Sequence, residues 1–279
     1  MDKVIIFGCG STGMRTYGQL KESCEVIAFF DNDKGKSGSS VDGIPVYVPE
    51  KRLLMQLNYD YIVIASVYGK WQIREQLYEM GVTDEKIRLY PRNPDVLSPY
   101  LKNLAEVFRE ENISGACAEV GVFRGESAKK INHYFHDRKL HLYDTFEGFS
   151  EMDIEIENQF GSRHVKEGQF GDTSLQIVME HMETPENVII HKGYFPDTAA
   201  GLEDKFCFVR IDLDLYAPTK SALDIFTPLM SGGGVILVHD YFGSQYPGIK
   251  KVVNEFLSKN PNLCKMPIGD AMSIAIMGF

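Results

Sequence analysis

Acidic and imidazole side chains follow two apolar runs in the C-terminal half of the chain. Asp212 and Asp214 come after the run FCFVRI, and His239 and Asp240 come after the run GVILV. Oxygen and nitrogen ligands that converge on one crevice suit a hard divalent cation or an acid–base centre. The alternative is that some of these side chains only cap helices or end strands in solvent. Because two such clusters stand at matched positions, we predict a functional centre formed by all four residues.

The pattern around these residues predicts the elements that position them. Both apolar runs have the length and the β-branched or aromatic content of buried strands. Between them, PTKSALDIFTPLM has apolar residues at helical spacing and stops at SGGG. A strand–helix–strand unit implies a parallel sheet, in which ligands bind beyond the carboxyl ends of the strands. Adjacent strands lie about 4.8 Å apart, so residues at their ends can reach one ion.

A second motif, ACAEVGVFRGES, predicts a nucleotide site of a particular kind. Glu119 stands at the end of its strand, where a carboxylate disfavours a phosphate but suits an ammonium or sulfonium group. S-adenosylmethionine (SAM) carries both groups and no phosphate. The next strand, KLHLY, ends at Asp144, where a carboxylate can accept the hydroxyls of a ribose. The residues that we expect to bind SAM are Glu119, Gly121, Ser127, Asp144, Thr145, Lys192, Gly193 and Tyr194.

The N-terminal part contains a separate glycine-rich loop. GCGSTG at 8–13 follows a strand and opens a helix, an arrangement in which backbone amides can approach a phosphate. We expect Gly8, Gly10, Gly13 and Asp31 to form a nucleotide loop, in which Asp31 accepts a ribose hydroxyl. Three possibilities stay open: a nucleotide or nucleotide-sugar, NAD(P), or a docking domain that keeps the glycines for close packing. No second mononucleotide half and no group for hydride transfer is visible, which disfavours NAD(P).

Length and composition favour two ordinary globular domains. The chain has 279 residues, of which 44% are hydrophobic and 24% charged, and its net charge is −10. An acidic protein gives no electrostatic support for a nucleic-acid or anionic-membrane partner. The stretch YPRNPDVLSPY, rich in proline and turn formers, is typical of a linker. We expect a Rossmann-like nucleotide-binding domain at 1–92, a linker at 93–99 and a SAM-dependent methyltransferase domain at 100–279.

The cysteines and the apolar segments indicate the cellular compartment of the protein. The five cysteines are scattered without a C-x-x-C pair, which is typical of buried thiols in a reducing environment. The apolar run at residues 4–7 is too short for a signal peptide, and no apolar stretch reaches the roughly 18 residues that a membrane helix needs. We therefore predict a soluble, cytoplasmic protein, and we expect it to be a homo-oligomer in the form of a dimer.

Two further segments carry structural expectations. Residues 147–171 are polar and break any helical or strand period. A loop of this length inside a compact domain is typically a lid or disordered, and we expect a lid that orders over the cofactor when substrate is present. Near the C-terminus, CKMPIGD and MSIAIMGF are expected to be antiparallel sixth and seventh strands of the second sheet.

Five motifs in order resemble a known family. EVGVFRGESA, LYDTFEGF, HKGYFPDT, RIDLDLYAPTKSAL and GGGVILVHDYF are similar to motifs of the macrocin O-methyltransferase (TylF) family, over about residues 98–279. The resemblance implies an α/β protein whose second domain has the class I SAM-dependent methyltransferase fold, with a mostly parallel, seven-stranded sheet. The N-terminal part, with GCGSTG, FFDND and YDYIVIAS, resembles the small Rossmann-like domain of nucleotide-sugar-modifying proteins.

The resemblance also implies roles for the four residues of the first centre. The metal ligands of the family carry over to Asp212, His239 and Asp240, and Asp214 is the candidate general base. Where the family has an acidic pair, this chain has His239 and Asp240, and imidazole is a poorer ligand for Mg²⁺ than for Mn²⁺. His239 is therefore also a candidate base if no metal binds. On a continuing strand Asp214 would share a side with Asp212, and we expect no Lys or Arg beside these acids.

These expectations define one function and two alternatives. We predict a SAM-dependent O-methyltransferase, assisted by Mg²⁺ or Mn²⁺, that acts on a hydroxyl of a nucleotide-sugar, a saccharide or a glycosylated natural product. One alternative is an NAD-dependent sugar oxidoreductase or epimerase, which Glu119 disfavours because such an enzyme needs a phosphate loop there. The other is a non-catalytic nucleotide-sugar-binding protein, which the presence of Asp212, Asp214 and Asp240 disfavours.

Overall fold

The chain forms two compact units, Met1–Pro94 and Asp95–Phe279. The computed structural model describes all residues except 67–68, 90–94, 161–164 and 244. Of the predicted linker at 93–99, residues 93–94 lie outside the described part, and a helix already begins at Leu97. Among the described residues, no helix combines the length and the apolar character that crossing a membrane requires.

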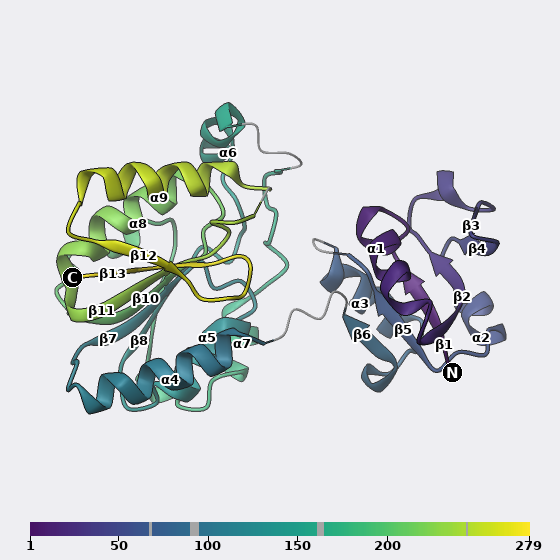
Figure 1. The fold of residues 1–279 in the computed structure, drawn as a ribbon, viewed down its shortest axis with the longest axis horizontal. Coiled ribbons are helices and arrows are strands. Elements are labelled where there is room, and N and C mark those ends of the chain that lie inside the picture. The colour runs from purple at the N-terminus through teal and green to yellow at the C-terminus, as the bar shows by residue number, and fades with distance from the viewer. Residues whose placement is uncertain (67–68, 90–94, 161–164, 244) are drawn as a thin grey trace. The chain divides into compact units, whose positions relative to one another are not determined.

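The first unit is built on a six-stranded sheet in the order β3-β4-β2-β1-β5-β6 (Figure 1). Strand β1 pairs in parallel with β2 on one side and with β5 on the other, so the strand order reverses between β1 and β5. In such sheets ligands bind beyond the strand ends at this reversal, and the GCGSTG loop leaves β1 there. The elements are β1 (Asp2–Phe7), α1 (Ser11–Leu20), β2 (Cys24–Phe30), β3 (Ser40–Val41), β4 (Ile44–Tyr47), α2 (Lys51–Gln56), β5 (Tyr61–Ile64), α3 (Lys70–Glu79) and β6 (Ile87–Leu89).

The second unit is built on a seven-stranded sheet in the order β12-β13-β11-β10-β7-β8-β9. Its helices are α4 (Leu97–Glu110), α5 (Glu126–Tyr134), α6 (Glu151–Glu157), α7 (Leu175–Glu180), α8 (Tyr216–Phe226) and α9 (Pro247–Lys259). Its strands are β7 (Ala116–Val120), β8 (Leu140–Asp144), β9 (Val188–Lys192), β10 (Phe206–Ile211), β11 (Met230–Val238), β12 (Cys264–Pro267) and β13 (Ile274–Met277).

One strand of this sheet runs against the others. Strand β13 is antiparallel to both of its neighbours, β11 and β12, whereas the pairs from β11 across to β9 are parallel. Strand β12 therefore runs with the rest of the sheet, and the prediction of two antiparallel C-terminal strands is wrong for the sixth. The reason is the crossover helix α9, which returns the chain to the end of the sheet from which β11 started, as in other parallel connections.

The central strands are buried on both faces, which explains why they appear in the sequence as continuous apolar runs. Every residue of β7 and β10 is buried. One face packs against α8 and α9 through Leu223, Phe226 and Val253, and the other packs against α4 and α5 through Phe108 and Ile131. Figure 1 shows these two helical layers on opposite sides of the sheet. Polar residues at the strand ends are thereby held by a rigid core.

The segment 147–171, predicted to be a lid, contains regular structure among its described residues, which exclude 161–164. That it orders over the cofactor stays a prediction. It forms α6 and a single 3-10 turn, η3 (Asn158–Phe160). Ser150 caps α6 by accepting a hydrogen bond from the amide of Asp153, at 3.3 Å. The apolar period was missing because the buried side of this helix carries two acids, Asp153 and Glu157, in addition to apolar groups.

Gly121 allows the end of β7 to approach the chain that leaves β10. Its φ is +87°, and a Cβ at this position would lie 2.1 Å from the carbonyl oxygen of Asp212. We expect Gly121→Ala to lower the free energy of unfolding by more than the roughly 1–2 kcal/mol that a left-handed backbone costs by itself. Urea unfolding measures this. The matched control is Gly201→Ala, because Gly201 has a φ of +75° but a Cβ there meets nothing within 4 Å. Equal losses in the two variants would contradict the steric explanation.

Candidate active site

Asp212, His239 and Asp240 lie together at the carboxyl ends of two neighbouring parallel strands. The residues Ile211 and Val238, which end β10 and β11, are register partners. The sheet pairing extends one residue further, because the amide of His239 donates to the carbonyl of Ile211 at 2.9 Å. One ligand atom from each of the three side chains lies within 4.8 Å of the others.

The donor set of these residues fits a divalent cation. The Nδ1 atom of His239 lies 2.9 Å from Oδ1 of Asp212 and 3.3 Å from Oδ1 of Asp240. Among the described residues, this buried nitrogen has no hydrogen-bond partner. Two carboxylate oxygens and one imidazole nitrogen that converge in this way are ligands suited to Mn²⁺ or Zn²⁺, and less to Mg²⁺.

The charges around His239 decide its protonation in the free protein. Burial by itself would lower the pKa of this imidazole, but the negative charges of Asp212 and Asp240 outweigh burial and raise the pKa to about 10. An imidazole that is protonated at neutral pH does not accept a proton. The electrostatics of the free protein therefore disfavour His239 as the base.

Asp214 occupies a turn and is not part of a continuing strand. Strand β10 ends at Ile211, and Asp214 has a φ of +61°, in the left-handed region. The argument that Asp214 shares a side with Asp212 through strand alternation is therefore wrong. Burial, followed by the charges of Asp240 and Asp212, raises the pKa of Asp214 well above its usual range. Asp214 can act as a base only in its ionised form, and its place beside Asp240 keeps it the candidate.

The expectation that no cation stands beside these acids is also wrong. Arg210 lies in β10 and is 6% exposed, and its Nη1 is 2.7 Å from Oε1 of Glu119 and 2.6 Å from Oδ2 of Asp212. Burial opposes ionisation of Asp212, but Arg210 and His239 outweigh it and hold its pKa well below the usual range. Sequence reasoning missed Arg210 because it counted FCFVRI as an apolar run. The signal was an arginine inside a strand whose other residues are all apolar.

Glu119 has a fully buried carboxyl group whose two oxygens differ in their hydrogen bonding. It is 0% exposed, and its Oε1 accepts hydrogen bonds from Ser127 and Arg210. Its Oε2 is buried and has no hydrogen-bond partner in the part of the chain that the structure describes. Burial raises the pKa of Glu119 to about 7, against the opposing effects of Arg210 and Ser127. A buried oxygen without a partner is available to a donor group of a ligand, such as an ammonium.

Asp144 uses both of its carboxylate oxygens within the protein. Oδ2 accepts hydrogen bonds from the amides of Val122 and Phe123, at 2.7 and 2.8 Å, and Oδ1 accepts from the amide of Phe146 at 2.7 Å. The side chain thus ties the loop after β7 to the end of β8. Next to it, the Thr145 hydroxyl donates to the carbonyl of Gly148 at 3.3 Å. These contacts show an organising role, and the expected contact of Asp144 with a ribose stays a prediction.

The remaining residues expected to bind SAM lie after β9. Lys192 is exposed, and the amide of Gly193 donates to the carbonyl of Asp144 at 3.0 Å. The hydroxyl of Tyr194 donates to Oδ1 of Asp153, in α6, at 2.8 Å. Together with Glu119, Gly121 and Ser127 they surround the carboxyl ends of β7, β8 and β9.

In the first unit, the three fingerprint glycines differ in how closely the described residues pack against them. A Cβ on Gly8 would lie 2.6 Å from the carbonyl oxygen of Ala65, and a Cβ on Gly13 would lie 1.9 Å from that of Gly8. A Cβ on Gly10 would meet none of the residues that the structure describes within 4 Å. Asp31 accepts hydrogen bonds from the amide of Cys9 at 2.8 Å and from Lys36 at 2.9 Å, so its carboxylate is partly occupied. Close packing accounts for Gly8 and Gly13 but not for Gly10.

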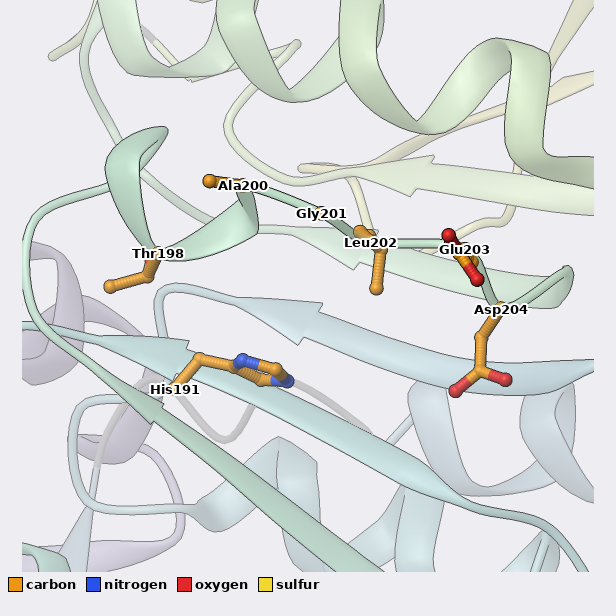
Figure 2. A pocket seen from close by; sticks show the side chains of 7 residues that line it. All are labelled: His191, Thr198, Ala200, Gly201, Leu202, Glu203 and Asp204. Atoms are coloured by element: carbon orange, nitrogen blue, oxygen red, sulfur yellow. The ribbon is translucent and has the colours of Figure 1, made fainter.

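A pocket of about 290 Å³ lies apart from the residues predicted for the centre. Figure 2 shows the ring of His191 on one side of it and the carboxylates of Glu203 and Asp204 at one end. Its lining residues are His191, Thr198, Ala200, Gly201, Leu202, Glu203 and Asp204. None of the residues predicted for the site is among them.

A stacked pair of histidines adjoins this pocket. The ring of His191 stacks on that of Tyr143, with centroids 4.2 Å apart, and its Nε2 lies 3.0 Å from Nδ1 of His141. Burial lowers the pKa of both histidines, and for His141 the charge of His191 acts in the same direction. Asp204, whose Oδ2 is 3.1 Å from Nε2 of His141, acts in the opposite direction.

The lowered pKa values predict acid sensitivity. A histidine whose pKa falls on folding binds fewer protons in the native state, so stability decreases as the pH falls through its unfolded pKa of about 6.5. His191→Phe keeps a ring to stack on Tyr143 but cannot be protonated. We expect this variant to lose less unfolding free energy than the native protein between about pH 7.5 and about pH 5, measured with urea. His136→Phe, at an exposed position, is the control. Identical pH dependence of the His191 variant and the native protein would contradict the assignment.

The strand order of the second unit, with β13 as the one antiparallel strand among the described residues, is that of the class I methyltransferase fold. The chain belongs to the macrocin-O-methyltransferase (TylF) family, whose model matches residues 98–274. This confirms the predicted family resemblance and the predicted fold class. Residues 1–88 match a different model, described as C2185-like, N-terminal.

Two curated relatives and one solved structure illustrate the similarity. The 8-demethyl-8-(2,3-dimethoxy-alpha-L-rhamnosyl)-tetracenomycin-C 4'-O-methyltransferase of Streptomyces olivaceus is 28% identical over 153 residues, which cover 50% of this chain and 58% of that protein. The demethyldecarbamoylnovobiocin O-methyltransferase of Streptomyces niveus is 26% identical over 204 residues, covering 67% and 76%. The O-methyltransferase NovP has a TM-score of 0.54 at 22% identity, covering 65% of this chain and 79% of its own, and shares the fold. The chain thus spans a little over half of the first relative.

Proposed function

We propose that this protein is a SAM-dependent O-methyltransferase that acts on a hydroxyl group of a sugar, carried by a nucleotide, a saccharide or a glycosylated natural product. The observation that carries the proposal is the centre of Asp212, Asp214, His239 and Asp240 at the carboxyl ends of β10 and β11, in a member of the TylF family. The names of the two curated relatives support methylation of oxygen, and the name of the first includes a rhamnosyl group.

The residues of the centre have separate roles in the reaction. Asp214 accepts the proton of the acceptor hydroxyl as the new carbon–oxygen bond forms and the carbon–sulfur bond of SAM breaks, which leaves S-adenosylhomocysteine (SAH). Glu119, with its unpartnered oxygen, holds the positively charged methionine part of SAM. Asp212, His239 and Asp240 would hold a divalent cation. When bound, such a cation supplies charge stabilisation to a hydroxyl oxygen that is losing its proton.

The proposal is tested by ligand binding and product analysis with the full chain. Calorimetry should detect SAH binding, and incubation with SAM and a panel of nucleotide-sugars and glycosides should yield a methylated product by mass spectrometry. NAD(H) serves as the competing ligand, because a sugar oxidoreductase or epimerase would bind it. Absence of SAH binding together with NAD(H) binding to the second unit would overturn the proposal.

We propose further that the first unit binds the nucleotide part of an activated sugar. Gly10 supports this, because it stands in the fingerprint loop and internal packing does not require it. Calorimetry with UDP, other nucleoside diphosphates and NADH, on the native chain and on Gly10→Val, tests this proposal. We expect the native chain to bind a nucleoside diphosphate and the substitution to remove that binding. Binding of NADH in place of the nucleoside diphosphate would contradict the proposal. That the protein forms a dimer also stays a proposal, which light scattering tests.

A further inference from the structure

Two buried acids of α6 contact Tyr194, in the predicted SAM site, and Tyr216, which follows the turn at Asp214. Asp153 accepts a hydrogen bond from the hydroxyl of Tyr194, which belongs to the predicted SAM site. Glu157 accepts one from the backbone amide of Tyr216 at 2.8 Å, and Tyr216 follows Asp214 by two residues. Glu157 is 0% exposed, although it stands in a polar segment. A buried carboxylate on a surface helix is uncommon, because removing a charge from water is costly unless neighbouring groups compensate it.

Asp214 lies in a short span of chain that is held at both ends. At one end, the amide of Asp212 donates to the carbonyl of Val120 at 2.8 Å and attaches the span to β7. At the other end, the amide of Tyr216 donates to Glu157. The left-handed conformation of Asp214 is costly for a residue with a Cβ and persists only where its surroundings determine it. Glu157 supplies the attachment at the second of these ends.

The surroundings of Glu157 explain why its charge is tolerated there. Tyr216 is the first residue of α8, and Gly248 is the second residue of α9. Gly248 approaches so closely that a Cβ on it would lie 2.8 Å from both carboxylate oxygens of Glu157. Helix N-termini present unpaired amides and partial positive charge, which stabilise a carboxylate. The ring of Phe160, in η3, adds a contact with the ring of Tyr216 at a centroid distance of 4.6 Å.

We propose that Glu157 is a positioning residue for methyl transfer: by holding the amide of Tyr216, it sets the turn that presents Asp214 to the acceptor hydroxyl. This inference rests on the proposed function, in which Asp214 is the base. Glu157 acts through the backbone of the turn and contacts neither the predicted SAM residues nor the three cation ligands among the contacts described above. Its loss is therefore expected to reduce kcat and to leave the affinity for SAH unchanged.

The experiment compares three variants of the full-length protein. Glu157→Ala removes the acceptor, and we expect kcat to fall by about 10- to 100-fold, as misplacement of a catalytic group commonly costs. Glu157→Gln keeps one oxygen that can accept the Tyr216 amide, and we expect it to recover most of the loss. Glu155→Ala is the matched control, because Glu155 is an exposed acid on the same helix. The dissociation constant of SAH, measured by calorimetry, should stay within about threefold of the native value in all three, since the SAM contacts are unchanged.

A second measurement does not depend on activity. Amide hydrogen exchange followed by mass spectrometry should show faster exchange of residues 213–217 in Glu157→Ala, and not in Glu155→Ala, because the Tyr216 amide has lost its acceptor. Unchanged exchange overturns the positioning role, whatever the activity. A kcat equal to that of the native protein, or a parallel loss of SAH affinity, also overturns it. If the native protein methylates no acceptor, the proposed function fails, and the exchange measurement still decides whether Glu157 holds the turn.

Discussion

We expect Asp214→Asn to keep the fold and the affinity for SAH and to lose methyl transfer, with kcat lowered by about 10²- to 10⁴-fold. A carboxamide has nearly the shape of a carboxylate and tolerates the left-handed backbone of this position, but it cannot accept the hydroxyl proton. Single-turnover kinetics with saturating SAM measures the loss.

The control for this variant is Asp224→Asn. Asp224 is a half-exposed aspartate of α8 that pairs with Lys220, and it takes no part in the centre. Its substitution should leave kcat within about twofold, since a surface ion pair of this kind contributes little. If Asp214→Asn turned over as fast as the Asp224 variant, another group would have to be the base.

The second large effect is expected from removal of divalent cations. Exhaustive chelation should lower methyl transfer by about 10²-fold or more, because a Lewis acid stabilises transition-state charge by several kcal/mol. Mn²⁺ should restore activity better than Mg²⁺, since the donor set contains the imidazole of His239. His239→Asp should shift this preference toward Mg²⁺.

Substitutions at the carboxylates distinguish weaker binding of the cation from a disturbance of the residues around it. Asp240→Asn is the sharper variant, because Asp212 also pairs with Arg210 and its loss would disturb a buried charge. We expect Asp240→Asn to require a higher Mn²⁺ concentration for half-maximal activity while its thermal stability stays close to native. Full activity of the native protein after chelation, verified by metal analysis, would show that these three residues hold no catalytic cation.

The meeting of Asp212, His239 and Asp240 could be predicted because it follows from a general property of parallel sheets. Neighbouring parallel strands end at the same edge, so side chains directly after two buried runs must converge. The apolar runs themselves were recognisable because the sheet is covered on both faces. Helix α8 was recognisable between them for the same reason, since its apolar stripe faces the core.

What the sequence could not show depends on neighbours that are distant along the chain. Arg210 is buried beside Glu119 because β10 pairs with β7, a register that no local pattern contains. Helix α6 was missed because its buried side includes Asp153 and Glu157, whose partners lie in other elements. The turn at Asp214 was missed because a positive φ at a non-glycine residue depends on attachments at both of its ends.

The guanidinium of Arg210 has a consequence for the affinities of the two ligands. It is shared between Glu119, on the side expected to hold the cofactor, and Asp212, on the side expected to hold the cation. A positive group that arrives at either acid changes how strongly Arg210 is drawn to the other. If a bound cation changes the affinity for SAM by some factor, bound SAM must change the affinity for the cation by the same factor, because coupling between two sites is reciprocal. The two binding equilibria of this protein are therefore expected to be linked through a single buried side chain.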